Sequence, residues 1–125
     1  MKYIKQRHKY GCGVACLAMV TGNSYETVRR AFTFDAAKTG LTVQHIIHYL
    51  SSLGYWIQLK DEVANSLTKQ YYLRTVCPYI FMVQKNLISK FHFVILVNDK
   101  LYDPADKTNM YLYNYTVVAA IGVIK

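Results

Sequence analysis

The hydrophobic and polar positions divide the chain into two unlike halves. Up to about residue 54, the apolar residues recur at helical spacing or fill short segments that end at a glycine. From residue 55 they form runs that are rich in aromatic and β-branched side chains, as strands are. Helices followed by strands predict an α+β fold, with a helical half of about 1–54 and a sheet half of about 55–125.

The first apolar segment, GCGVACLAMV at residues 11–20, has too few polar residues to be amphipathic. A helix that is apolar all round must be enclosed by the rest of the fold, and Gly22 marks its end. Ser24 then predicts the N-cap of a short helix through Phe32, with Glu26 in its first turn. We expect this buried first helix to pack on the sheet.

A loop is expected over FDAAKTG, residues 34–40, before the next helix. Thr42 caps that helix, whose apolar positions follow helical spacing up to Gly54. Strands are predicted at 55–59 (YWIQL), 78–84 (PYIFMVQ), 91–97 (FHFVILV), 100–103 (KLYD) and 116–125 (TVVAAIGVIK). A further short helix is predicted at 63–69, and the strands are expected to form an antiparallel sheet.

Composition narrows the class of protein. The chain has 125 residues, of which 53% are hydrophobic and 18% are charged, so it can build a core as a single domain over 1–125. Three cysteines cannot all pair, and an odd count favours free thiols in a reducing compartment. No apolar stretch precedes Cys12, and the tail at 117–124 is too short to span a membrane. We therefore expect a cytoplasmic protein without a membrane span.

The net charge of +8 raises the question of a nucleic-acid partner. The basic residues are scattered, however, and the chain contains no basic helix stripe, zinc-finger spacing or aromatic RNA-binding signature. A solvated basic surface is the simpler explanation, so nucleic acid is an unlikely partner.

Cys12 carries the strongest chemical signal. A thiol at a helix amino terminus faces unpaired backbone N–H groups and the positive end of the helix dipole, which both favour the thiolate. Gly11 and Gly13 remove side-chain bulk on either side, which would let a substrate backbone approach the sulfur. These features suit a nucleophile, and a small buried hydrophobe is the alternative for Cys12. For Cys16, one turn inside the helix, and for Cys77, beside Pro78, the small buried hydrophobe is the expected role. A metal site fails because too few ligands are available, and no cofactor is expected.

His92 is the best candidate for a partner base, because it interrupts the nearly continuous apolar run at 91–97. His8 lies in the charged amino-terminal segment, and His45 and His48 flank a helical stripe. If Asn98 and Asp99 form a two-residue hairpin, position 103 pairs with position 94 on the face that His92 shares. Asp103 would then lie diagonally across from His92, where a carboxylate can orient an imidazole. A buried structural His–Asp pair is the alternative.

Three motifs together resemble a known family. The first is Q-x5-C-G-x-A-C-L-A-M at residues 6–19, followed by HFV at 92–94 and YDP at 102–104. In this order they resemble the bacteriocin-processing cysteine peptidases that cleave double-glycine leaders. Those enzymes have a papain-like fold and commonly form the amino-terminal domain of an export ATPase. The length of this chain matches the peptidase domain, so a stand-alone version is expected.

The resemblance implies a role for each matching residue. Cys12 is the nucleophile, His92 the general base and acid, and Asp103 the residue that orients His92. Gln6 supplies its side-chain amide to the oxyanion hole, together with the backbone N–H of Cys12. The expected activity is hydrolysis of a peptide bond in a peptide or protein, after small residues such as Gly-Gly.

Two other functions remain open from the sequence. The same triad can perform deamidation or acyl transfer to an amine, or the fold can serve as a papain-like binding module without turnover.

Overall fold

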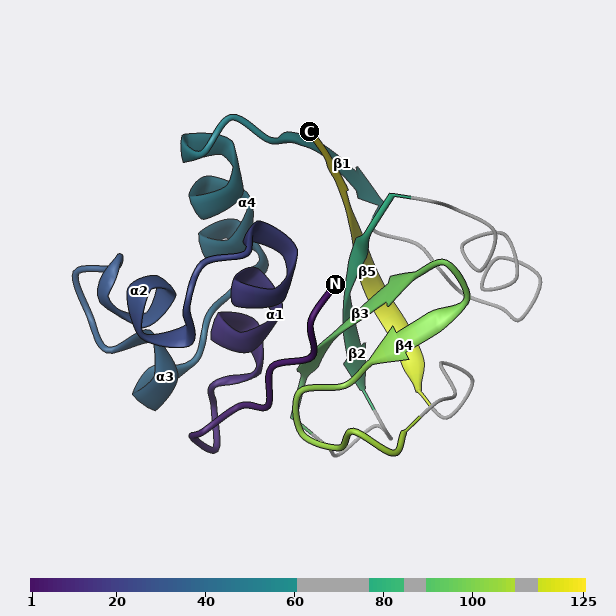
Figure 1. Ribbon diagram of the computed structural model, residues 1–125, viewed down its shortest axis with the longest axis horizontal. Helices are drawn as coiled ribbons and strands as arrows, with labels where there is room; N and C mark the ends of the chain where they lie inside the picture. The colour runs from purple at the N-terminus through teal and green to yellow at the C-terminus, as the bar shows by residue number, and fades with distance from the viewer. Residues whose placement is uncertain (61–76, 85–89, 110–114) are drawn as a thin grey trace.

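The computed structural model describes residues 1–60, 77–84, 90–109 and 115–125. Helices come first along the chain and strands follow, as predicted (Figure 1). The helices are α1 (Cys12–Thr21), α2 (Tyr25–Arg30), α3 (Ala36–Thr39) and α4 (Val43–Ser52). The strands are β1 (Trp56–Lys60), β2 (Tyr79–Gln84), β3 (His92–Val97), β4 (Lys100–Tyr102) and β5 (Thr116–Ile124).

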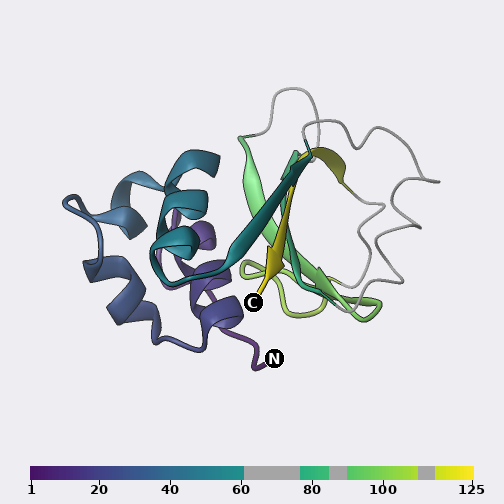
Figure 2. The ribbon, with the colours of Figure 1, turned by 90° about the horizontal axis from the view of Figure 1, so that it is seen from above.

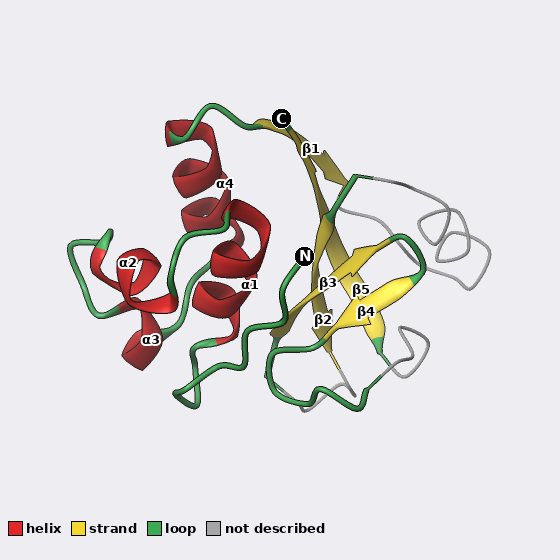
Figure 3. Ribbon diagram, in the orientation of Figure 1, coloured by secondary structure: helices red, strands yellow, loops and turns green. Residues whose placement is uncertain are grey.

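The helices and the sheet form two layers. Figure 3 shows the helices on one side and the strands on the other, and the view from above in Figure 2 places all the helices against one face of the sheet. The sheet has the order β1-β5-β2-β3-β4, and all neighbouring strands are antiparallel. The predicted α+β architecture is confirmed.

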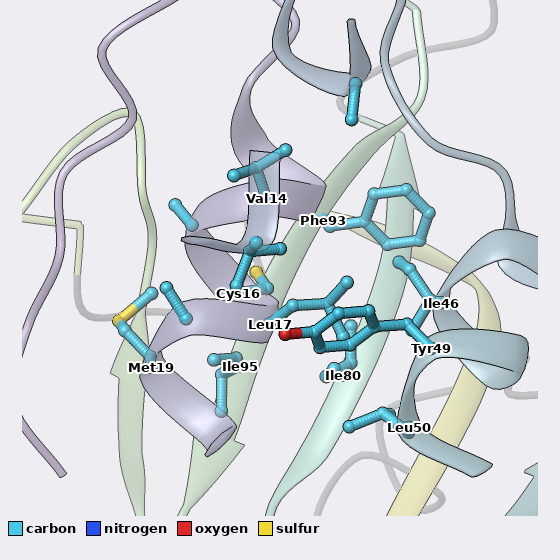
Figure 4. Packing of buried hydrophobic residues seen from close by; sticks show 14 of the residues in the cluster. Val14, Cys16, Leu17, Met19, Ile46, Tyr49, Leu50, Ile80, Phe93 and Ile95 are labelled. Atoms are coloured by element: carbon cyan, nitrogen blue, oxygen red, sulfur yellow. The ribbon is translucent and has the colours of Figure 1, made fainter. Parts of the chain in front are cut away.

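α1 is the centre of this packing. Its residues from Gly13 to Met19 are buried, and it contacts β3 on one side and the other helices on the opposite side. Figure 4 shows Leu17 of α1 between the side chains of α4 and those of β2 and β3. The helix ends at Gly22, whose φ of 78° is the left-handed conformation that glycine adopts readily. The expectation of an enclosed apolar helix is confirmed.

The other helix caps agree with the sequence, and one loop does not. The Ser24 side chain accepts a hydrogen bond from the backbone N–H of Thr27, and Thr42 accepts one from that of His45. The expected loop at 34–40 contains the short helix α3. Asp35 explains this helix, because its carboxylate accepts hydrogen bonds from two backbone N–H groups of the first turn and binds Arg29.

The hairpin between β3 and β4 has the predicted register. Asn98 and Asp99 adopt φ values of 49° and 64°, as the two central residues of a tight hairpin turn require. Val97 pairs with Lys100, and the last residue of β4, Tyr102, pairs with Ile95 in the middle of β3. The predicted helix at 63–69 lies outside the described residues. Within the described ranges, no helix combines the length and apolar character needed to cross a membrane.

Candidate active site

Cys12 is the first residue of α1 and is partly exposed. The first N–H groups of any α-helix lack an intrahelical acceptor. Gly11 occupies the N-cap position of α1 and has no side chain that could accept from them. The thiol therefore lies at the positive end of a buried helix. This position stabilises negative charge on sulfur and on any oxygen held beside it.

The two glycines beside Cys12 have a different purpose from the one expected. A Cβ at Gly11 would lie 2.0 Å from the hydroxyl oxygen of Tyr25, and one at Gly13 would lie 3.2 Å from the Cβ of Leu41. The space beside each glycine is thus filled by another side chain, and the expectation that it admits a substrate backbone was wrong. The glycines instead let α2 and the segment before α4 pack closely against the start of α1.

The amino-terminal segment ties this region to the loop after β4. The backbone N–H of Gln6 donates to the carbonyl of Pro104 at 3.0 Å, and the Tyr3 hydroxyl donates to the carbonyl of Asp103 at 2.7 Å. These contacts join residues about 100 positions apart in the chain. They place the segment that leads to Cys12 against the residue that pairs with His92.

The Gln6 side chain supports the turn before Cys12. Its amide nitrogen donates to the carbonyl of His8 at 2.9 Å and to that of Lys9 at 3.1 Å. Its oxygen Oε1 is buried and accepts no hydrogen bond from any residue in the described part of the chain. In this conformation the amide hydrogens are therefore committed to the turn at residues 8–9.

His92 and Asp103 meet as the hairpin register predicts. Nε2 of His92 lies 2.7 Å from Oδ1 of Asp103, and their side chains are 20% and 1% exposed. Burial acts to lower the pKa of His92, but hydrogen bonds with Asp103 and Cys12 and their negative charges outweigh it, and the pKa rises to about 9. The imidazole is therefore a cation at neutral pH.

The same contacts orient the imidazole ring. Because Asp103 occupies Nε2, Nδ1 is the ring nitrogen that remains to interact with Cys12, whose presence contributes to the raised pKa of the imidazole. Cys12 comes from the helical layer, whereas the histidine and the aspartate come from the sheet layer. An imidazole held between a thiol and a carboxylate can accept the thiol proton and return it later.

Asp103 is held by four donors. Oδ1 also accepts from the backbone N–H of Ala105 at 2.9 Å, and Oδ2 accepts from Nδ2 of Asn109 at 2.9 Å and from the Tyr115 hydroxyl at 2.5 Å. Burial alone would raise the pKa of Asp103, but its hydrogen bonds, led by that with His92, hold it well below its usual range. The carboxylate stays charged and its orientation is fixed from both sides.

Sequence reasoning missed Asn109 and Tyr115, and also Tyr25. Burial and the bond to Asp103 raise the pKa of Tyr115 well above its usual value, so it remains a donor. Both donors to Oδ2 follow Asp103 within twelve residues, but the segment 110–114 lies between them and no periodic pattern marks either one. The sequence places Tyr25 in a short helix, but nothing in it indicates that the Tyr25 hydroxyl lies beside Gly11.

Cys12 and His92 line one cleft of about 770 Å³ between the two layers. One wall comes from the segment before α4 and its first residues, and the other comes from β2 and the start of β3. The lining residues are Lys9, Tyr10, Cys12, Thr39, Gly40, Leu41, Thr42, Val43, Gln44, Met82, Lys90, Phe91, His92 and Phe93. A cleft of this size is sufficient for several residues of an extended peptide.

The remaining cysteines and histidines lie elsewhere. Cys16 is completely buried in the core, and burial raises the pKa of its thiol well above the usual value. Cys16 is therefore a packing residue, which confirms the expectation of a small buried hydrophobe at this position. His45 belongs to the cap of α4, where its Nδ1 accepts from the backbone N–H of Thr42, and His8 contacts the hydroxyl of Tyr25.

This chain is similar to one protein family and to several solved structures. The sequence model of the Peptidase C39 family matches residues 1–111, whereas no curated protein sequence gives a match. The peptidase domain of Streptococcus ComA, described as a bi-functional ABC transporter involved in a quorum-sensing pathway, superposes with a TM-score of 0.71. The identity is 21%, over 98% of this chain and 97% of that one.

Two structures of the peptidase domain of Streptococcus mutans ComA are also similar. One is a complex with a small-molecule inhibitor, and the TM-scores are 0.68 and 0.70 at 18% identity, each over 100% of both chains. At these identities the structural likeness establishes the papain-like fold, and the family match covers most of the sequence. The chain thus belongs to the Peptidase C39 family and is a cysteine peptidase.

Proposed function

We propose that the protein hydrolyses a peptide bond through a triad of Cys12, His92 and Asp103. The observation that carries the proposal is that Cys12 and His92 line the same cleft while Asp103 binds the far side of the imidazole. Each residue comes from a different element, and two layers of the fold have to meet before they converge. A purely structural His–Asp pair would not require a thiol at the open nitrogen of the ring.

The proposed reaction has two halves. His92 holds the proton that Cys12 has given up, and the Cys12 thiolate forms a bond to the substrate carbonyl carbon, whose oxygen becomes negative. When the carbonyl reforms, the C–N bond breaks and His92 gives its proton to the departing amine. Water then attacks the acyl–sulfur bond with His92 as base, which releases the acid and restores the thiol.

The oxyanion is assigned to the backbone N–H of Cys12 and to the side-chain amide of Gln6. The first donor is supported by its position at the open end of α1. The second requires the Gln6 amide to exchange one of its bonds to the turn at residues 8–9 for the oxyanion. Removal of one such donor costs on the order of 3 kcal/mol of barrier.

Small residues such as Gly-Gly are proposed on the amino-terminal side of the cleaved bond. The resemblance to double-glycine peptidases motivates this preference. It is also supported by Leu41, which lines the same cleft as Cys12 and fills the space beside Gly13. A cytoplasmic location is proposed from the odd number of free cysteines.

The test is cleavage of a peptide library followed by mass spectrometry. We expect products from chain cleavage with the parent protein and none with Cys12→Ala, because the acyl–sulfur bond cannot form. Cys77→Ala is the matched control and should retain activity. Activity should also fall as the pH rises through about 9, where His92 loses its proton and the ion pair with the thiolate is lost.

Two results would contradict the proposal. Cleavage that survives Cys12→Ala excludes this thiol as the nucleophile. A change in substrate mass without chain cleavage, dependent on Cys12, indicates deamidation or acyl transfer instead of hydrolysis.

A further inference from the structure

The cleft has an uneven charge distribution. Two lysines, Lys9 and Lys90, are among its lining residues, and none of the aspartates and glutamates that the structure describes is among them. Lys9 precedes Cys12 by three residues, and Lys90 precedes His92 by two. Both cations therefore lie on the segments that lead directly into the two reacting side chains.

Tyr10 brings these cations together. Nζ of Lys90 donates to the Tyr10 hydroxyl at 2.7 Å and lies 4.7 Å from the centre of its ring, while Nζ of Lys9 lies 5.5 Å from the same ring. The hydrogen bond from Lys90 and the charges of both lysines lower the pKa of Tyr10. Lys9, Tyr10 and Lys90 thus form a basic cluster across the cleft.

The protein does not neutralise this cluster within the part of the chain that the structure describes. Glu26 and Asp35 form ion pairs with arginines, and Asp103 is paired with His92. No ion pair joins either lysine to a carboxylate among those residues. Cations held beside a cleft without a carboxylate of their own attract anionic groups that enter it.

We propose that the basic cluster is a subsite for an acidic side chain of the substrate, so that the enzyme prefers peptides with Glu or Asp near the cleaved bond. The inference rests on the proposed peptidase function and specifies its substrate class. An extended peptide advances about 3.3 Å per residue, and Tyr10 is two residues from Cys12. The acidic residue is therefore expected within about three residues of the cleaved bond.

The test compares peptides that differ in one charge. A peptide cleaved in a Cys12-dependent manner is synthesised with Glu, Gln or Lys at each position within three residues of the cleaved bond. At one or two positions, kcat/KM should be on the order of fivefold higher for Glu than for Gln, and lower still for Lys. Added salt should reduce this ratio because it screens exposed charges.

Lysine variants locate the effect. In Lys9→Gln/Lys90→Gln the Glu-to-Gln ratio of kcat/KM should fall to about one, because both lysines are exposed cations of the cleft lining and the variant removes their charge. Lys38→Gln/Lys100→Gln changes the net charge equally outside the cleft lining and should leave the ratio unchanged. An equal loss in both double variants would indicate a general charge effect and overturn the subsite.

A binding measurement separates this inference from the proposed function. The same peptides, carrying a neutral fluorophore, are titrated with Cys12→Ala protein and followed by fluorescence polarisation. Cys12-dependent cleavage without a charge preference in either assay overturns the subsite alone. If the parent protein cleaves no peptide of the library, tighter binding of Glu-containing than of Gln-containing library peptides that depends on Lys9 and Lys90 supports the subsite and overturns the peptidase mechanism.

Discussion

Asp103 is a residue whose chemistry depends on neighbours that the sequence does not mark. It is 2% exposed, and an ionised carboxylate at such a site is stable only when its oxygens accept hydrogen bonds. His92, Ala105, Asn109 and Tyr115 provide these bonds. The same carboxylate raises the pKa of His92, so the donors to Asp103 act on the imidazole through it.

Tyr115→Phe tests this dependence. Loss of one donor to a buried charged group costs about 1.5–3 kcal/mol, and the pKa of Asp103 should rise toward its usual value. A carboxyl group with a lowered pKa stabilises the fold above its unfolded pKa, and this contribution disappears as the pH falls through the folded value. The acid limbs of stability and of kcat/KM should therefore both move to higher pH.

The two measurements are urea unfolding and a pH profile of kcat and KM. Tyr115 does not line the cleft, so the loss should appear in kcat with KM nearly unchanged. Tyr102→Phe removes a hydroxyl from the neighbouring residue and leaves the hydrogen bonds of Asp103 intact. An unshifted acid limb in Tyr115→Phe would exclude a positioning role for this tyrosine.

At the scale of the elements, the start of α1 depends on the fit between a glycine and a tyrosine. Tyr25 is 2% exposed, and its hydroxyl contacts Nδ1 of His8 at 3.0 Å and fills the space beside Gly11. The φ of Gly11 is −89°, which any residue can adopt. Gly11 is therefore required by the close approach of α2 rather than by its backbone conformation.

Gly11→Ala should destabilise the fold by about 1–3 kcal/mol, because its Cβ would lie far inside the contact distance of the Tyr25 hydroxyl. Tyr25→Phe removes that oxygen, so the alanine should cost much less in the Tyr25→Phe background. Urea unfolding of both single variants and of the double variant measures this coupling. Strictly additive costs would show that the two residues do not compete for the same space.

At the scale of the whole molecule, the candidate site exists only when the two layers are packed together. Cys12 belongs to the helical layer, whereas His92 and Asp103 belong to the sheet (Figure 1). The side chains that hold the layers together, among them Leu17, Ile46, Ile80 and Ile95, are completely buried (Figure 4). The stability of this interface and the geometry of the site are therefore coupled.

Leu17→Ala should lower the free energy of unfolding by about 2–5 kcal/mol, since it leaves a cavity between α1 and its neighbours. Activity and circular dichroism should be lost at the same urea concentration, at a lower value than in the parent protein. Leu53→Ala is the control, because Leu53 is 45% exposed and should change stability by less than about 0.5 kcal/mol. Activity lost well before the fold would show that the site opens without separation of the layers.

The sequence by itself determined the features that follow from local chemistry. The apolar composition of residues 11–20, the caps Ser24 and Thr42, and the runs rich in aromatic and β-branched residues correctly predicted most of the elements. The hairpin at Asn98–Asp99 also determined that His92 and Asp103 meet, because a two-residue turn fixes the register on both strands. The helix α3 was missed because its four residues are too few to show a helical period, although Asp35 caps it directly.

Only the tertiary structure decided which distant segments lie together. The last strand, β5, is inserted between β1 and β2, Tyr115 reaches Asp103, and Tyr25 occupies the space beside Gly11. The cleft with its basic cluster likewise depends on residues from both layers. Local patterns report the period and the ends of an element, whereas these contacts arise from shape and polarity matched between segments far apart in the chain.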